Sequence, residues 1–140
     1  MAEGRLELVD KTVQTTYKWV NELADQIGWH DRHKSFRMLR ATLHALRDLL
    51  QVNEAVQLGA QLPTLIRGVY YEGWKPVQTQ KAGHSKTFFD RVQIEMYPDL
   101  VEDMDTKLAN VFTLLSRHVS AGEISDVKNC MPPDLRKLWN

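Results

Sequence analysis

The residues best suited to metal chemistry lie in the segment WHDRHK, residues 29–34. His30, Asp31 and His33 could each offer a ligand atom, and His44 follows on the next predicted helix. Zinc needs three or four converging ligands in strict geometry, and no HExxH pair occurs in the chain. An aspartate that caps a helix explains the same segment without a metal. A metal-binding protein or enzyme that uses His30 and His33 is therefore kept as the alternative hypothesis, and no cofactor is predicted.

Other patterns for catalysis or phosphate binding are missing, since the chain contains no GxSxG, GxxxxGK[ST] or GxGxxG. The single cysteine, Cys130, falls in an apolar register before Met131, so we expect it to be buried and structural. The acidic run DLVEDMD, residues 99–105, suits the solvated first turn of a helix, where the macrodipole favours negative charge. We therefore predict no catalytic residue.

Charge balance argues against nucleic acid and membrane surfaces as partners. Lysine plus arginine and aspartate plus glutamate number 18 each, so the formal net charge is zero. The segment from Lys75 to Lys86 also contains Lys81 and no acidic residue. Nucleic-acid binding through this loop is the third hypothesis. With one cysteine, no secretory leader pattern and no membrane-spanning run, the sequence predicts a cytoplasmic protein.

The elements that must position these residues are helices. Apolar residues recur at three- and four-residue steps in nearly every segment, which predicts an all-α fold. The first stripe runs from Val13 to Ile27 and is expected to face a core, and Gly28 ends it. Asp31 and Asn53 are the predicted N-caps of the next two helices. The later predicted helices are 64–71 after Pro63, one around 88–96, 101–119 and 123–130.

A shift of 69 residues superposes the second half of the sequence on the first. It places Glu54 on Glu123, Pro63 on Pro132 and Arg67 on Arg136, with apolar residues on apolar residues between them. Two tandem pseudo-repeated helical units explain this match. We predict one domain over residues 1–140, with unit 1 at about 11–74, a linker at about 75–85 and unit 2 at about 86–139.

The segment EAVQLGAQLPTLIRGVYYEGW, residues 54–74, resembles an uncharacterised bacterial family called domain of unknown function 2267. The spacing GEI, DV, P, DLR and LW within residues 114–139 is similar to the second half of the same family. The resemblance covers most of the chain. It implies an all-helical fold and a bacterial cytoplasmic protein, and it implies no activity, cofactor or catalytic residue.

The repeated LP…R element is interpreted as a structural corner, because catalytic residues are seldom kept in both copies of a duplication. The corner residues are Glu54, Pro63 and Arg67 in the first copy and Glu123, Pro132 and Arg136 in the second. An antiparallel return of the helix after each proline would bring the arginine back towards the glutamate. We therefore predict the intra-unit ion pairs Glu54–Arg67 and Glu123–Arg136.

Tyr71 and Trp74 have no counterparts in the second copy and are the predicted partner-binding residues. Gly73 and Pro76 place Trp74 just outside a regular helix. There the ring either covers the seam between the units as a lid or stands exposed for a protein partner. The preferred function is a non-enzymatic helical module that acts by protein contact, with its partner and oligomeric state open.

Overall fold

The computed structural model describes residues 4–76 and 85–139, and all regular elements in these ranges are helices. They are α1 (Glu7–Ile27), α2 (Arg32–Leu49), α3 (Val52–Ala60), α4 (Thr64–Tyr71), α5 (Ser85–Met96), α6 (Met104–His118), α7 (Ala121–Asn129) and α8 (Pro133–Arg136). The predicted all-α fold class is confirmed.

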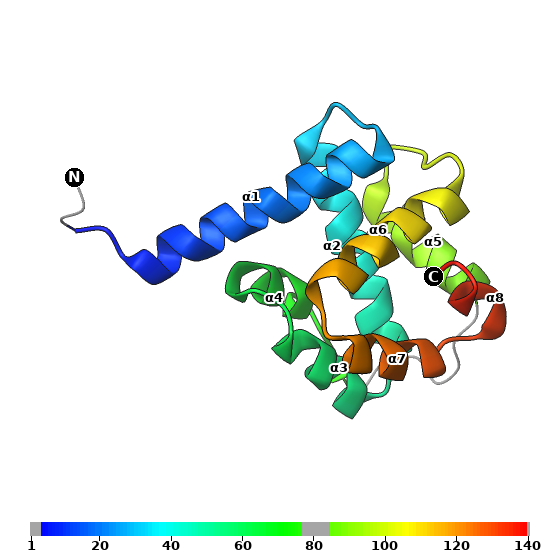
Figure 1. Cartoon of the computed structure of the whole chain (residues 1–140). Coiled ribbons are helices and arrows are strands. Elements are labelled where there is room, and N and C mark those ends of the chain that lie inside the picture. The colour runs from blue at the N-terminus through cyan, green and yellow to red at the C-terminus, as the bar shows by residue number, and fades with distance from the viewer. Residues whose placement is uncertain (1–3, 77–84, 140) are drawn as a thin grey trace.

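Helix α2 forms the centre of the molecule, with α1, α4, α5 and α6 packed around it, as Figure 1 shows. Its residues from Met38 to Arg47 are buried almost without interruption. The two segments that the sequence predicts as separate units pack closely together, because α5 packs on α2 and α6 packs on α1. Apolar residues from both halves of the chain therefore share one core, and Tyr70 and Trp139 are among its largest buried side chains.

Local chemistry sets several helix ends. Gly28 takes the left-handed conformation, with φ of 83°, and donates its N–H to Ala24 O. The Asp31 carboxylate accepts from Lys34 N at 3.0 Å and caps α2 as predicted. The predicted cap at Asn53 is wrong, because α3 begins two residues earlier, at Val52, with Gln51 as its N-cap residue.

The first apolar stripe only partly faces the core, which corrects the sequence prediction. Helix α1 extends beyond the body of the protein (Figure 1), so Val20 and Leu23 are buried whereas Val13 and Tyr17 are exposed. A 21-residue helix is about 30 Å long and exceeds the core that it covers. The N-cap residue Leu6 and the first half of α1, together residues 6–17, are called the overhang below.

The two proline corners have the same geometry. Pro63 has φ and ψ of −60° and 154°, and Pro132 has −63° and 150°. Arg67 donates from Nε to Gly59 O at 2.9 Å, and Arg136 donates from Nε to the matching carbonyl of Lys128 at 2.9 Å. This likeness supports a duplication, although duplication of the complete units stays a prediction.

The predicted ion pairs Glu54–Arg67 and Glu123–Arg136 are wrong. Each guanidinium instead binds carbonyls at the end of the preceding helix, and Arg67 also donates to Ala60 O and Leu62 O. The last carbonyls of a helix have no intrahelical donors and carry the negative end of its dipole, so they compete well for an arginine. The glutamates are thereby left for a different contact.

Candidate functional site

The histidines of the WHDRHK segment do not gather a ligand set. His30 and His33 are exposed, and within the described residues the only group of three potential ligands that converge lies elsewhere. His44 is buried in the α2–α5 interface and is engaged there. The structure therefore does not bring His44 to the two exposed histidines.

His44 belongs to a buried ionic network. Its Nδ1 lies 2.8 Å from Glu95 Oε2, and its Nε2 lies 2.8 Å from Val69 O. The two ring nitrogens therefore face acceptors on α5 and α4. Arg91 on α5 donates from Nε to Asp48 Oδ2 on α2 at 2.9 Å. The network fixes α5 and α4 on the central helix, which is a structural role.

The lysine loop falls largely outside the described residues, since Lys81 lies within 77–84. Lys75 and Lys86 are exposed at its ends, and Lys86 pairs with Asp90 at 3.0 Å. These contacts neither support nor contradict a phosphate-binding role. Nucleic-acid binding stays the untested third hypothesis.

Tyr71 and Trp74 form a half-buried aromatic stack beside α3. Their ring centroids are 5.5 Å apart with an interplanar angle of 26°, and both side chains pack against the core. Gly59 makes room for the phenol, because a Cβ at that position would come within 2.6 Å of Tyr71 Cζ. The half-burial fits the lid hypothesis better than a freely exposed ring, and the role in binding stays a prediction.

Replacing Trp74 with alanine should lower the free energy of unfolding by about 1.5–2.5 kcal/mol, roughly half the usual cost for a fully buried tryptophan. The loss comes from the contacts with Tyr71 and the core below it. Urea denaturation followed by circular dichroism measures this change, with the exposed Tyr97→Ala as the matched control. Equal midpoints for Trp74→Ala and wild type would show that Trp74 is not a lid.

The most unusual polar arrangement is at the seam where α3 and α7 lie side by side (Figure 1). Carboxylate oxygens of Glu54, Glu123 and Asp126 lie within 4.8 Å of one another, and these residues are called the carboxyl cluster. The Glu123 residue is only 8% exposed. Burial, together with the hydrogen bond and the negative charge of Glu54, raises the pKa of Glu123 to about 8. The Glu123 carboxyl is therefore expected to keep its proton near neutral pH.

Cys130 lies at the edge of the carboxyl cluster and is exposed, so the prediction of a buried cysteine is wrong. It is the C-cap residue of α7, where the chain turns, rather than part of the buried face before Met131. Partial burial and the nearby carboxylates, with Glu54 foremost, raise the pKa of its thiol. A thiol that is held protonated is a weak nucleophile.

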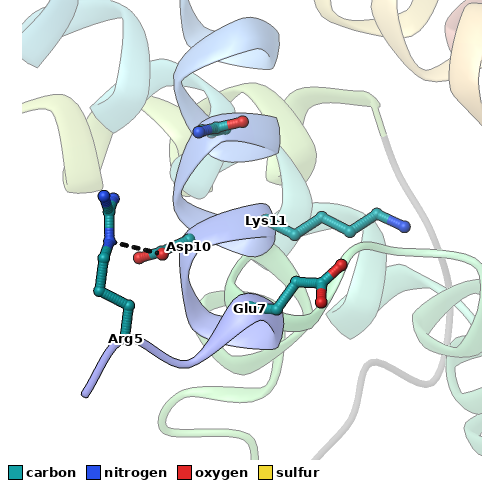
Figure 2. Close-up of a pocket in the computed structure, with 5 residues that line it drawn as sticks. Arg5, Glu7, Asp10 and Lys11 are labelled. Atoms are coloured by element: carbon teal, nitrogen blue, oxygen red, sulfur yellow. Dashed lines mark hydrogen bonds and ion pairs between the residues drawn. The ribbon is translucent and has the colours of Figure 1, made fainter. Parts of the chain in front are cut away.

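Two hollows flank the overhang. One is polar and is drawn in Figure 2, where Arg5 binds Asp10 while Glu7 and Lys11 point away from that pair. The other is apolar, has a volume of about 430 Å³ and lies between α1, α2 and α4. This α1–α2–α4 hollow is lined by Val13, Thr16, Tyr17, Val20, Arg32, His33, Phe36 and Leu65.

Only part of the acidic run at residues 99–105 forms the solvated first helical turn that the sequence predicts. Asp105 lies in the exposed first turn of α6. Asp99 instead binds Arg37 at 2.6 Å. Arg37 also donates to Met96 O at 2.6 Å, so its side chain holds the end of α5 against α2.

The protein is therefore all-helical, and charged side chains at the interfaces between its helices hold the helices together. No helix within residues 4–76 and 85–139 combines the length and apolar character of a membrane span. A family model described as "Uncharacterized conserved protein (DUF2267)" matches residues 16–138. The chain belongs to this family, as its motifs indicated. Comparison with curated proteins found no match.

Sequence reasoning identified Glu54 and Glu123 but paired each with the wrong residue. It also missed Asp126 and the α1–α2–α4 hollow. The equivalence of Glu54 and Glu123 under the 69-residue shift was the available signal. Nothing in the local sequence indicated that the overhang would leave Val13 and Tyr17 uncovered.

Proposed function

We propose that this protein is a non-enzymatic cytoplasmic module that binds a protein partner by receiving an amphipathic helix against α1. The observation that carries the proposal is the exposure of Leu6, Val9 and Val13 along the overhang, which leads into the apolar α1–α2–α4 hollow that Val13 also lines. Large exposed apolar patches on folded proteins often mark interaction sites. A helix laid in an apolar groove is a common mode of peptide recognition.

The apolar stripe of α1 has the spacing of a helix-pairing seam. Leu6, Val9, Val13, Thr16, Val20 and Leu23 alternate steps of three and four residues. Val20 and Leu23 use this seam to pack on the protein's own core. Leu6 and Val9 continue it at 67% and 49% exposure. A partner helix would therefore extend a packing mode that α1 already uses.

The hollow adds chemical selectivity to this surface. Arg32 and His33 are the basic residues of its lining, and the guanidinium carbon of Arg32 lies 5.2 Å from the centre of the Tyr17 ring. Beside the hollow, Thr12 Oγ1 accepts a hydrogen bond from Leu65 N at 3.0 Å, and this bond holds α4 against α1. The expected partner helix thus inserts a large apolar side chain and carries acidic residues beside it.

A nuclear magnetic resonance titration with a synthetic peptide tests the proposal. The peptide is an amphipathic helix with leucines at positions i, i+3 and i+7 and glutamates on the flanks. We expect shifts centred on Phe36 and Leu65, with at least tenfold weaker binding in Val13→Asp, because a carboxylate would enter the apolar contact. Ile94→Asp, at an exposed apolar position on α5, is the matched control.

Three results would contradict the proposal. The first is the absence of shifts at millimolar peptide, and the second is equal binding by Val13→Asp and wild type. The third is dimerisation in sedimentation experiments that Val13→Asp abolishes, because a second copy of the chain would then occupy the surface. A peptide with lysines in place of glutamates should bind more weakly if Arg32 and His33 contribute.

A further inference from the structure

Two buried carboxylate oxygens in the carboxyl cluster point into the α3–α7 seam without a hydrogen-bond donor. They are Oε2 of Glu54 and Oε2 of Glu123, and both are shielded from solvent. Asp126, the third member, is exposed and forms the open edge of the cluster. A buried acceptor that lacks a donor is costly, and a buried negative charge is more so.

The local structure explains why neither a backbone N–H nor a basic side chain reaches these oxygens. Ser120 and Glu123 have the spacing of a capping box, and Ser120 Oγ accepts from Glu123 N at 3.2 Å. The return bond is not made, because Ser120 N donates to Gln61 Oε1 at 3.1 Å. The Glu123 carboxylate is thereby free to turn towards Glu54.

The nearest repeated arginines are also engaged elsewhere. Arg67 donates to the end of α3, and Arg136 donates to Lys128 O and to Met131 O. Among the described residues, the ion pairs of the protein include none with Glu54, Glu123 or Asp126. The cluster therefore combines three carboxylates with no basic side chain paired to them.

We propose that Glu54, Glu123 and Asp126 bind one oxygen-preferring divalent cation at the α3–α7 seam. Carboxylates are the ligands that Ca²⁺, Mg²⁺ and Mn²⁺ prefer, and water completes such sites at an open edge. The cation offsets the repulsion between the carboxylates and supplies the buried oxygens with a partner. It also links a helix of the first unit to a helix of the second. This site is independent of the helix-binding surface on α1.

Metal titrations of chelator-treated protein test the site. Calorimetry and thermal unfolding are carried out at pH 8 with CaCl2, MgCl2 or MnCl2, at constant ionic strength in KCl. At least one cation should bind with one-to-one stoichiometry and raise the midpoint of thermal unfolding. Binding should weaken at pH 6, because protons compete for the carboxylates.

Glu123→Gln and Asp126→Asn should each lose at least tenfold in affinity, while Asp105→Asn, at an exposed acidic position of α6, should bind as wild type does. Asp126 is exposed, so its variant keeps the test valid even if Glu123→Gln folds poorly. No binding of any of the three cations at 1 mM would overturn the proposal. Equal binding by Asp126→Asn and wild type would also overturn it.

Discussion

In a chelator-containing buffer, the free energy of unfolding should fall by about 3–5 kcal/mol between pH 4.5 and pH 8 because of Glu123. The pKa of its carboxyl group is about 8 in the folded protein, against an ordinary value of 4.5. Below pH 4.5 the carboxyl group is protonated in both states, so its contribution is fully present. As the pH rises towards 8, only the unfolded state releases the proton, and stability is lost.

The variant Glu123→Gln isolates this effect. Its neutral amide can donate to Glu54 as the protonated acid does, so the pH dependence due to Glu123 should disappear. Asp105→Asn, in the exposed first turn of α6, should keep the wild-type slope. Urea denaturation at several pH values measures the slopes. Parallel curves for Glu123→Gln and wild type would show that this carboxyl does not hold a proton in the folded state.

Arg47→Met should destabilise the protein by about 3–5 kcal/mol, the usual cost of removing one partner of a buried ionic contact. The Arg47 side chain is only 3% exposed and lies 2.9 Å from Asp48. Its Nη1 donates to Tyr70 O at 3.0 Å and to Glu72 O at 2.8 Å. Methionine keeps the aliphatic volume but leaves both carbonyls and part of the carboxylate without donors.

Two further variants make this measurement specific. Arg47→Lys should recover only part of the loss, since one ammonium cannot reproduce the fork that spans the carboxylate and both carbonyls. Arg5→Met removes the exposed pair with Asp10 and should cost about 0–1 kcal/mol. Denaturant midpoints at neutral pH give all three values. A loss for Arg47→Met as small as that for Arg5→Met would contradict the structural role of Arg47.

The variants Arg47→Met and Glu123→Gln test different parts of the fold. Arg47 holds the end of α4, from which the chain continues to Trp74, so its loss should also loosen the aromatic stack. Glu123 lies at the seam between the units and should affect how α3 and α7 meet. Comparing Trp74→Ala with Arg47→Met would show whether the stack depends on this anchor. Their effects should be non-additive if it does.

The sequence by itself determined the helices and several of their ends. Apolar periodicity predicted the all-α class, while Gly28, Asp31 and Pro63 marked ends that the structure confirms. These signals are local, because a cap or a proline acts within one turn of its own helix. The 69-residue shift likewise predicted two similar corners, and Pro63 and Pro132 adopt the same backbone conformation.

Only the tertiary structure decided which side chains meet. Glu54 lies beside Glu123, not Arg67, because the packing of α3 on α7 joins residues that are far apart in the chain. Tyr17 is exposed because α1 is longer than the core beneath it, which no pattern within α1 can show. Periodicity reports which face of a helix is apolar. How much of that face is covered, and by which charges, depends on the other helices and on where they end.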